Sequence, residues 1–219
     1  MKRIGCFHAH YSNIEYIEKA IEPYKFELIH FVDPGLDCMK MDSAFTETFI
    51  HRKIKSTLDW ISQCHVDAIL VTCTLFTAHI PDKLSYPIPI IKIDEPLFQF
   101  ICENQNPQLM VFTNPSTIKG TIDQLNRYAE KQTKTIQVKP VLLENTFELI
   151  MKGKKEEYIK QVSIKLGELI KENPNKAVSA AQLSMVPAAE KVELETSTYI
   201  GNQLKFLSEY IKSFLDNLK

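Results

Sequence analysis

Apolar and polar positions alternate along this chain in blocks, and the most continuous apolar block lies at residues 66–71. Within it, Ala68 to Val71 are consecutive apolar residues with β-branched members, which is typical of a strand buried on both faces of a parallel sheet. The block ends at Thr72-Cys73-Thr74. The pattern therefore places Cys73 at the carboxyl end of a buried strand, the edge of an open α/β sheet where ligands bind.

Shorter apolar blocks predict further strands, and stretches in which apolar residues recur every three or four positions predict helices between them. Strands are expected at residues 3–8, 26–32, 88–93, 109–113, 136–142, 177–181 and 192–196. Helices are expected to begin at Ser12 or Asn13 and at Asn114, and to cover residues 43–64, 76–84, 94–103, 145–151, 154–172 and 198–218. Strands and helices that alternate at this spacing predict right-handed βαβ crossovers and a mostly parallel sheet, or two such sheets.

Four of the predicted strands end in the same way. The strands that finish at His8, Cys73, Thr113 and Gln182 each run into small polar residues just before a helix. A break in the pattern at residues 104–107 separates the first two of these strand ends from the last two. This coarse symmetry would allow strand ends from two half-domains to converge on one cleft.

The composition excludes several classes of protein. With 219 residues, 44% hydrophobic and 24% charged, the chain resembles an ordinary globular protein of one large or two small domains. The net charge of -1 and the lack of a basic stripe argue against nucleic acid as a partner. No run approaches the ~20 apolar residues of a membrane span. The amino-terminal sequence lacks the long apolar region of a signal peptide, so we expect a cytoplasmic protein.

The five cysteines are expected to be reduced thiols. They are odd in number, widely spaced and without a Cys-x-x-Cys pair, which fits neither a disulfide framework nor a zinc finger. Cys73 has the position that most favours chemistry. Its neighbours Thr72 and Thr74 can offer hydroxyl and N–H groups to an anion, which leaves the thiol as the most reactive group. The alternative is that Cys73 packs as a small hydrophobic residue.

Three segments of the chain resemble the site loops of the aspartate/glutamate racemase superfamily, in the same order and at fitting separations. They are residues 69–74 (Ile-Leu-Val-Thr-Cys-Thr), 111–117 (Val-Phe-Thr-Asn-Pro-Ser-Thr) and 180–185 (Ala-Ala-Gln-Leu-Ser-Met). The superfamily also includes hydantoin racemases, maleate isomerases and arylmalonate decarboxylases. The resemblance covers nearly the whole chain. It implies two pseudo-symmetric α/β halves, here residues 1–94 with 198–219 and residues 95–197, with the active site in the cleft between them.

The resemblance also implies a chemistry. Enzymes of this superfamily use no metal and no pyridoxal cofactor: one cysteine thiolate removes a proton from the substrate Cα, and a second cysteine returns a proton to the opposite face. By this resemblance Cys73 is the expected catalytic residue, and it acts on a small carboxylate-bearing molecule. The residues expected to bind the carboxylate and stabilise the enediolate are Thr72, Thr74, Thr113, Asn114, Ser116 and Thr117.

This sequence departs from the superfamily pattern where the second cysteine is expected. Residues 181–184 are Ala-Gln-Leu-Ser, and neither a glutamine nor a serine hydroxyl is a ready base. A single thiol can still perform one-sided proton transfer, addition to an activated alkene or lyase chemistry. We expect Gln182, Ser184 and His8 to shape the opposite wall of the site, although Ser184 could equally cap the next helix.

Two other functions stay open. One is a non-catalytic protein that binds a small carboxylate on the same fold. The other is a metal-dependent hydrolase, because His8 and His10 follow the first strand as a His-x-His pair. The other histidines do not repeat this pattern, so we expect an enzyme without metal or other cofactor. Asp94 is expected to cap a helix. A homodimer is an open alternative to a monomer.

Overall fold

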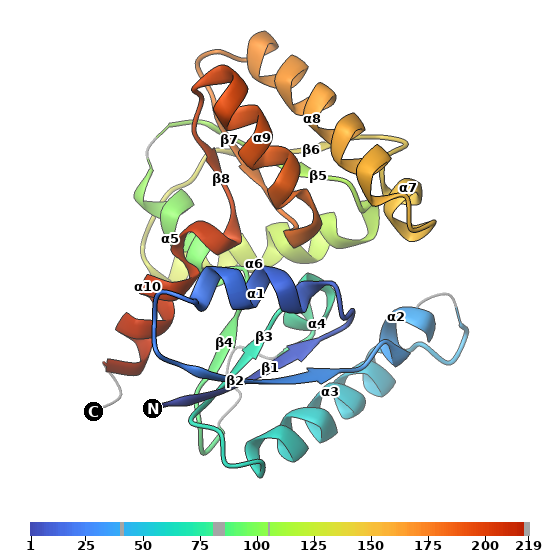
Figure 1. Ribbon diagram of the computed structural model, residues 1–219, viewed down its shortest axis with the longest axis vertical. Helices are drawn as coiled ribbons and strands as arrows, with labels where there is room; N and C mark the ends of the chain where they lie inside the picture. Colours follow the sequence, from blue (N-terminus) through green and yellow to red (C-terminus); the bar gives the residue numbers. More distant parts are fainter. Residues whose placement is uncertain (40–41, 81–85, 105, 217–219) are drawn as a thin grey trace. The chain divides into compact units, whose positions relative to one another are not determined.

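The structure, a computed structural model, describes the chain except for residues 40–41, 81–85, 105 and 217–219. It divides into two compact units, Met1–Asp94 with Leu207–Lys219 and Glu95–Phe206. Each unit contains a four-stranded parallel sheet flanked by helices (Figure 1). The predicted α/β class with two parallel sheets is confirmed. In the part of the chain that the structure describes, no helix is both long and apolar enough to cross a membrane.

The first unit has the strand order β2-β1-β3-β4. Its strands are β1 (Arg3–His8), β2 (Glu27–Val32), β3 (Ala68–Val71) and β4 (Ile90–Lys92). Its helices are α1 (Asn13–Ile21), α2 (Gly35–Met39), α3 (Glu47–Ser62), α4 (Thr74–Ala78) and most of α10 (Gln203–Asp216). All four residues of β3 are buried, as its unbroken apolar sequence predicts.

The two faces of this sheet carry different side chains. Phe7 of β1 packs against the apolar stripe of α3, which consists of Ile50, Ile54, Leu58 and Ile61. Because successive side chains of a strand point to opposite faces, Cys6 and His8 point away from α3. Their face is the one that α1 approaches. Polar and titratable groups are therefore buried on this face, whereas the α3 face is apolar.

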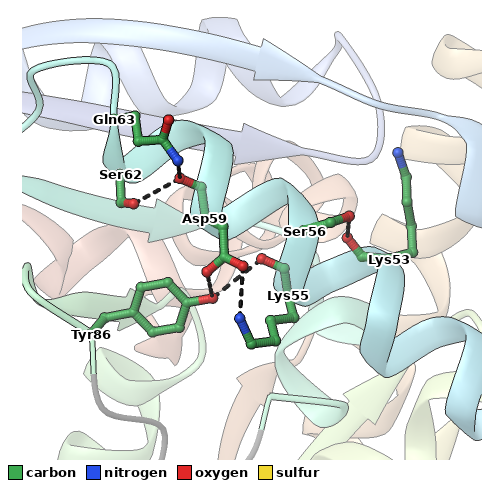
Figure 2. Close-up of polar contacts among 7 residues, drawn as sticks. All are labelled: Lys53, Lys55, Ser56, Asp59, Ser62, Gln63 and Tyr86. Carbon is green, nitrogen blue, oxygen red and sulfur yellow. Dashed lines mark hydrogen bonds and ion pairs between the residues drawn. The ribbon is translucent and has the colours of Figure 1, made fainter.

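A polar cluster links the exposed side of α3 to the segment that precedes β4 (Figure 2). The Tyr86 hydroxyl lies 2.8 Å from Asp59 Oδ1 and 3.2 Å from the Lys55 carbonyl oxygen, and Lys55 Nζ lies 2.7 Å from Asp59 Oδ2. Burial raises the pKa of Tyr86, and its hydrogen bond to Asp59 adds to the rise. The cluster is structural and lies in the first unit.

The second unit repeats this topology with the order β6-β5-β7-β8. Its strands are β5 (Gln108–Phe112), β6 (Val138–Leu142), β7 (Ala177–Ala180) and β8 (Ile200–Gly201). Its helices are α5 (Glu95–Glu103), the 3-10 turn η1 (Pro115–Thr117), α6 (Ile118–Lys131), α7 (Phe147–Met151), α8 (Lys155–Glu172), the 3-10 turn η2 (Leu183–Met185) and α9 (Val186–Thr196). Helices α8 and α9 share one apolar core with β5 and β7, and α5 and α6 share another.

The prediction of a strand at residues 192–196 is wrong. These residues form the end of α9, where Val192 is buried in the core shared with α8. The helix penalty of a β-branched residue is well below about 1 kcal/mol, so packing outweighs it. The helix ends at Thr196 and is capped by Ser197, whose backbone φ is 53°.

The last strand is instead β8, and the closing helix begins at Gln203 rather than at residue 198. A two-residue strand leaves no periodic signal in the sequence. It pairs with β7 through Ser179 and Gly201, where a Cβ on the glycine would lie 2.7 Å from Ser179 Oγ. The helix predicted at 76–84 is α4, which covers residues 74–78, and residues 81–85 lie outside the described residues.

Candidate functional site

Cys73 lies two residues beyond β3 and directly before α4. Its backbone is extended, and its carbonyl oxygen accepts a hydrogen bond of 2.9 Å from the N–H of Thr77, so it turns the chain from strand into helix. The side chain is half-buried. The structure therefore confirms that Cys73 follows the carboxyl end of a fully buried strand. Thr74 is the first residue of α4 and is also half-buried.

Thr72 joins this strand end to a buried histidine pair. Its hydroxyl lies 3.2 Å from the Phe7 carbonyl oxygen, which can only accept, so Thr72 Oγ1 donates there. The same oxygen then accepts from His8 Nδ1 at 2.8 Å and from Asn13 Nδ2 at 3.4 Å. With its proton on Nδ1, His8 accepts at Nε2 from His30 Nδ1, 2.9 Å away.

His8 is fully buried, and both of its ring nitrogens are engaged in these bonds. Burial, with a smaller contribution from the neighbouring His30, lowers the pKa of His8 from 6.5 to about 4. His8 is therefore neutral near pH 7. The geometry gives it the role of holding Thr72, the residue next to Cys73. Direct contact between His8 and a ligand would require one of these bonds to open.

The second unit has its own polar cluster, centred on Gln182. This residue follows β7 and precedes η2. Its amide oxygen Oε1 accepts three hydrogen bonds: from the backbone N–H of Thr113 at 2.8 Å, from the Thr113 hydroxyl at 2.8 Å and from the backbone N–H of Asn114 at 3.0 Å. Its Nε2 donates to Thr117 Oγ1 at 3.3 Å. Gln182 thus links the end of β7 to the loop that follows β5 through hydrogen bonds.

A chain of hydroxyl groups continues from this glutamine. Because the Thr113 hydroxyl donates to Gln182 Oε1, it accepts from the Tyr158 hydroxyl at 3.0 Å. The Tyr158 oxygen in turn accepts from Ser184 Oγ at 2.9 Å. Tyr158 is fully buried in α8. Ser184 therefore donates to Tyr158, Tyr158 donates to Thr113, and Thr113 donates to the Gln182 amide oxygen.

The loop after β5 starts α6 through the turn η1. Asn114 Oδ1 accepts from the backbone N–H of Ser116 at 3.1 Å and from its hydroxyl at 2.7 Å, and Pro115 takes the first position, as predicted. The Thr117 hydroxyl is buried and donates to the Asn114 carbonyl oxygen at 3.0 Å. Ser184 lies within η2, and Met185 rather than Ser184 precedes α9, so the alternative helix-cap role of Ser184 is wrong.

Equivalent hydrogen bonds show which residues correspond between the two units. The backbone N–H of Thr72 donates to the Phe7 carbonyl at 3.0 Å, and that of Ala181 donates to the Val111 carbonyl at 2.9 Å. Each bond joins the third strand of its unit in chain order to the first. The next residues are Cys73 and Gln182. Gln182 therefore stands in the second unit where Cys73 stands in the first.

The structure brings together most of the predicted residues within each unit. Thr72 and His8 are bonded beside Cys73, and Thr113, Asn114, Thr117 and Gln182 form one cluster that Ser184 joins through Tyr158. The sequence interpretation missed three participants: Asn13, His30 and Tyr158. Each sits in an amphipathic helix or a strand, and no local motif marks its polar group as facing inward.

The proposed pair of metal ligands His8 and His10 is not a pair in the structure. His10 is exposed, and its Nδ1 bonds to Ser12 Oγ at 2.8 Å. In the described part of the chain, the group of three or more His, Cys, Asp or Glu side chains that could hold a metal contains His8 but not His10. Asp94 precedes α5, and its Oδ2 lies 2.5 Å from the Thr77 hydroxyl.

These observations define a class: a two-unit α/β protein with a cysteine at one strand end and a glutamine at the equivalent strand end. No protein-family model matches the sequence, and no curated protein is significantly similar to it. Solved structures, in contrast, match almost the whole chain.

Three solved racemases illustrate the match. Glutamate racemase from Francisella tularensis, solved with D-glutamate, superposes with a TM-score of 0.70 at 16% identity, covering 99% of this chain and 81% of the racemase. Aspartate racemase from Picrophilus torridus gives 0.67 at 10% identity (97% and 94% covered), and allantoin racemase from Klebsiella pneumoniae 0.66 at 14% (99% and 88%). The chain therefore has the fold of the aspartate/glutamate racemase superfamily, as the resemblance implied.

Proposed function

We propose that this chain is a cofactor-independent, racemase-like enzyme in which Cys73 transfers a proton at, or adds to, a small carboxylate-bearing substrate. The observation that carries the proposal is the position of Cys73: a half-buried thiol that follows a fully buried parallel strand in a racemase fold. Amino-acid and allantoin racemases share this fold, which supports a substrate of that class.

The chemistry is assigned to groups that remain accessible. Cys73, as thiolate, takes the proton from the carbon next to the carboxylate, and Thr72 holds the position of Cys73 through its bond to His8. The candidate carboxylate donors are the half-buried Thr74 and Asn114. The exposed Ser116 hydroxyl would join them only by giving up its bond to Asn114 Oδ1. The hydroxyls of Thr113 and Thr117 are occupied by the Gln182 cluster, so they would stabilise this loop.

One-sided chemistry follows from Gln182. A carboxamide does not accept a proton at neutral pH, so a substrate proton removed by Cys73 returns to the same face. Exchange with solvent deuterium would then occur with retention of configuration. A cis-trans isomerisation through addition of the thiol to an activated alkene needs the same single group, which is why maleate belongs among the candidate substrates.

Proton exchange in D2O, followed by NMR, tests this proposal. The panel contains aspartate, glutamate, hydantoins, maleate and arylmalonates, each with wild type, Cys73→Ala and the control Cys64→Ala, which removes another half-buried thiol of the first unit. We expect exchange or conversion with at least one compound and a loss of at least about a hundredfold in Cys73→Ala only. Equal rates in wild type and Cys73→Ala would contradict the proposal.

A second function is binding of a small carboxylate without turnover. It is favoured by an observation that counts against stabilisation of an enediolate. The Gln182 amide already occupies the backbone N–H groups of Thr113 and Asn114, which are natural anion donors. Alkylation separates the two functions. A catalytic thiolate reacts with iodoacetamide well below about pH 8.5 and is protected by ligand, whereas a thiol in a binding protein reacts as an ordinary cysteine. Ligands that raise the melting temperature without turnover would support the binding function.

A further inference from the structure

Three metal-ligating side chains meet on the face of the first sheet opposite α3. Cys6 and His8 belong to β1, and His30 belongs to β2, directly beside Cys6 in the strand register. The Cys6 sulfur and one nitrogen of each imidazole all lie within 4.8 Å of one another. Cys6 and His8 are fully buried, and 16% of the His30 side chain is exposed. Cys6 and His30 have no part in the proposed proton transfer, and His8 contributes to it only by holding Thr72.

The bonding of the histidines prepares two nitrogens for an ion. His8 Nδ1–H is held by Thr72 Oγ1, so His8 presents the lone pair of Nε2. His30 Nδ1 lies 2.9 Å from that lone pair. Two imidazole nitrogens bound to one tetrahedral ion would stand about 3.3 Å apart, given metal–nitrogen distances of about 2.0–2.1 Å. The spacing of the two nitrogens therefore differs from that of a ligating pair by a few tenths of an ångström.

The second ring nitrogen of His30 also supports an ion at this position. His30 Nε2 is buried without a hydrogen-bond partner, and when His30 carries its proton on Nδ1 this nitrogen is an unused acceptor. Its nearest charged neighbour is Glu18 Oε1 of α1, at 3.6 Å, which is also an acceptor. If an ion takes the place of the proton on Nδ1, His30 carries its proton on Nε2 and donates it to Glu18. Carboxylate and hydroxyl partners of this kind orient metal-bound histidines in proteins.

The charges of the cluster also balance. Burial, with a smaller effect of Glu18, raises the pKa of Cys6 to about 12, so the thiol is protonated in the ion-free protein. A divalent ion expels that proton, and the thiolate together with the Glu18 carboxylate neutralises its two charges. The balance is one proton released to solvent for each ion bound, because the histidine proton only moves from Nδ1 to Nε2.

We propose that Cys6, His8 and His30 form a binding site for a borderline or soft divalent transition-metal ion such as Zn²⁺, with Thr72 and Glu18 as outer partners. One thiolate and two imidazoles suit this class of ion and disfavour Mg²⁺ and Ca²⁺, which prefer oxygen ligands. Three protein ligands leave one tetrahedral position for water. The ion would lock β1 to β2 in the first unit. This site shares His8 and Thr72 with the proposed function, but metal binding there does not require turnover by Cys73.

Cobalt is the probe that reports on the thiolate. Wild-type protein is produced in cobalt-supplemented minimal medium, so that the ion is present as the chain folds, and its absorbance and metal content are measured. We expect one Co²⁺ per chain, a thiolate-to-cobalt charge-transfer band in the near ultraviolet and displacement of the ion by Zn²⁺. Addition of metal to the ion-free protein should release one proton per ion. Absence of stoichiometric metal, or metal without the band, would overturn the proposal.

Matched variants locate the site. Cys6→Ala should abolish the band, and His30→Gln should weaken binding at least about a hundredfold, since it removes a ligand rather than an outer partner. The controls are Cys102→Ala, a half-buried thiol of the second unit, and His10→Gln, an exposed imidazole, and both should keep the band. If Cys6→Ala fails to fold, His30→Gln alone decides. Unchanged binding in His30→Gln would overturn the site.

Discussion

The strand ends that carry Cys73 and Gln182 are equivalent in topology but opposite in design. In the first unit, Thr72, His8 and His30 form a polar network next to the key residue in the chain, whereas the half-buried Cys73 side chain packs against the apolar cluster that contains Phe7 and Phe76. In the second unit, the key side chain is the centre of the network, because Gln182 accepts three hydrogen bonds from the neighbouring loop.

This difference shows how one position of a repeated fold can be occupied by a half-buried thiol in one unit and by a hydrogen-bonded amide in the other. Under the proposed function, the first position serves chemistry and the second serves stability. A glutamine at the end of β7 satisfies two backbone N–H groups that would otherwise lack an acceptor at the partly buried start of the loop after β5. The comparison leads to separate expectations for the two strand ends, and each can be measured.

The largest effect on stability is expected at Gln182. Gln182→Leu keeps the approximate volume but removes the acceptor for the N–H groups of Thr113 and Asn114, so the free energy of unfolding should fall by about 3 kcal/mol. Cys73→Ala should cost about 1 kcal/mol or less, because the thiol is only half-buried. Urea denaturation of both variants measures the contrast. Gln132→Leu, at an exposed glutamine of the same unit, is the control.

If Gln182→Leu lowers the free energy of unfolding no more than its exposed control does, the amide is not the structural centre of the second strand end. If only Cys73→Ala lowered the free energy of unfolding, the key side chain would stabilise the first strand end rather than the second.

A smaller effect, of about 2 kcal/mol, is expected from acid in the first unit. The pKa of His8 is about 4 in the folded protein and 6.5 as its ordinary value, because burial, and then His30, disfavour its charge. At pH 5 the unfolded chain therefore binds a proton that the folded chain does not. Stability is fully present above pH 6.5 and is lost as the pH falls toward 4, by about 2 kcal/mol between pH 7 and pH 5.

The measurement is urea denaturation of ion-free wild type, His8→Gln and the exposed control His10→Gln across this range. His8→Gln should flatten the dependence, and His10→Gln should keep it. The response belongs to the first unit, because all six histidines lie within residues 1–94. His30 and His79, whose pKa values burial also lowers, add to the wild-type slope with the same sign. If the pH dependence of stability is unchanged in His8→Gln, the acid response belongs to His30 and His79 instead.

The sequence predicted the elements that bury long periodic stripes and the strand ends that carry Cys73 and Gln182. It could not predict the partners of these residues. Tyr158 belongs to the apolar stripe of its helix, and nothing in that stripe shows that its hydroxyl meets Thr113, 45 residues earlier. His30 lies within a strand, and its bond to His8 depends on the pairing of β1 with β2. Such contacts are properties of the folded sheet, whereas helix periodicity and strand ends are local.

The smallest effect is expected at Tyr158, and it decides whether the second strand end acts as one unit. Tyr158→Phe removes the hydroxyl between Ser184 and Thr113, so the free energy of unfolding should fall by about 1 kcal/mol. Tyr128→Phe, at a half-buried tyrosine of α6 outside this chain of hydroxyls, is the control.

The double variant Tyr158→Phe/Gln182→Leu tests whether the two side chains act together. In wild type, the Tyr158 hydroxyl donates to Thr113, and Thr113 donates to Gln182. Without the Gln182 acceptor, the Thr113 hydroxyl is free to donate toward Tyr158 instead, so the tyrosine substitution should cost a different amount in that background, by at least about 0.5 kcal/mol. Additive costs would mean that the hydroxyl chain and the amide are independent. In that case Gln182 would stabilise the β5 loop mainly through the backbone N–H groups of Thr113 and Asn114.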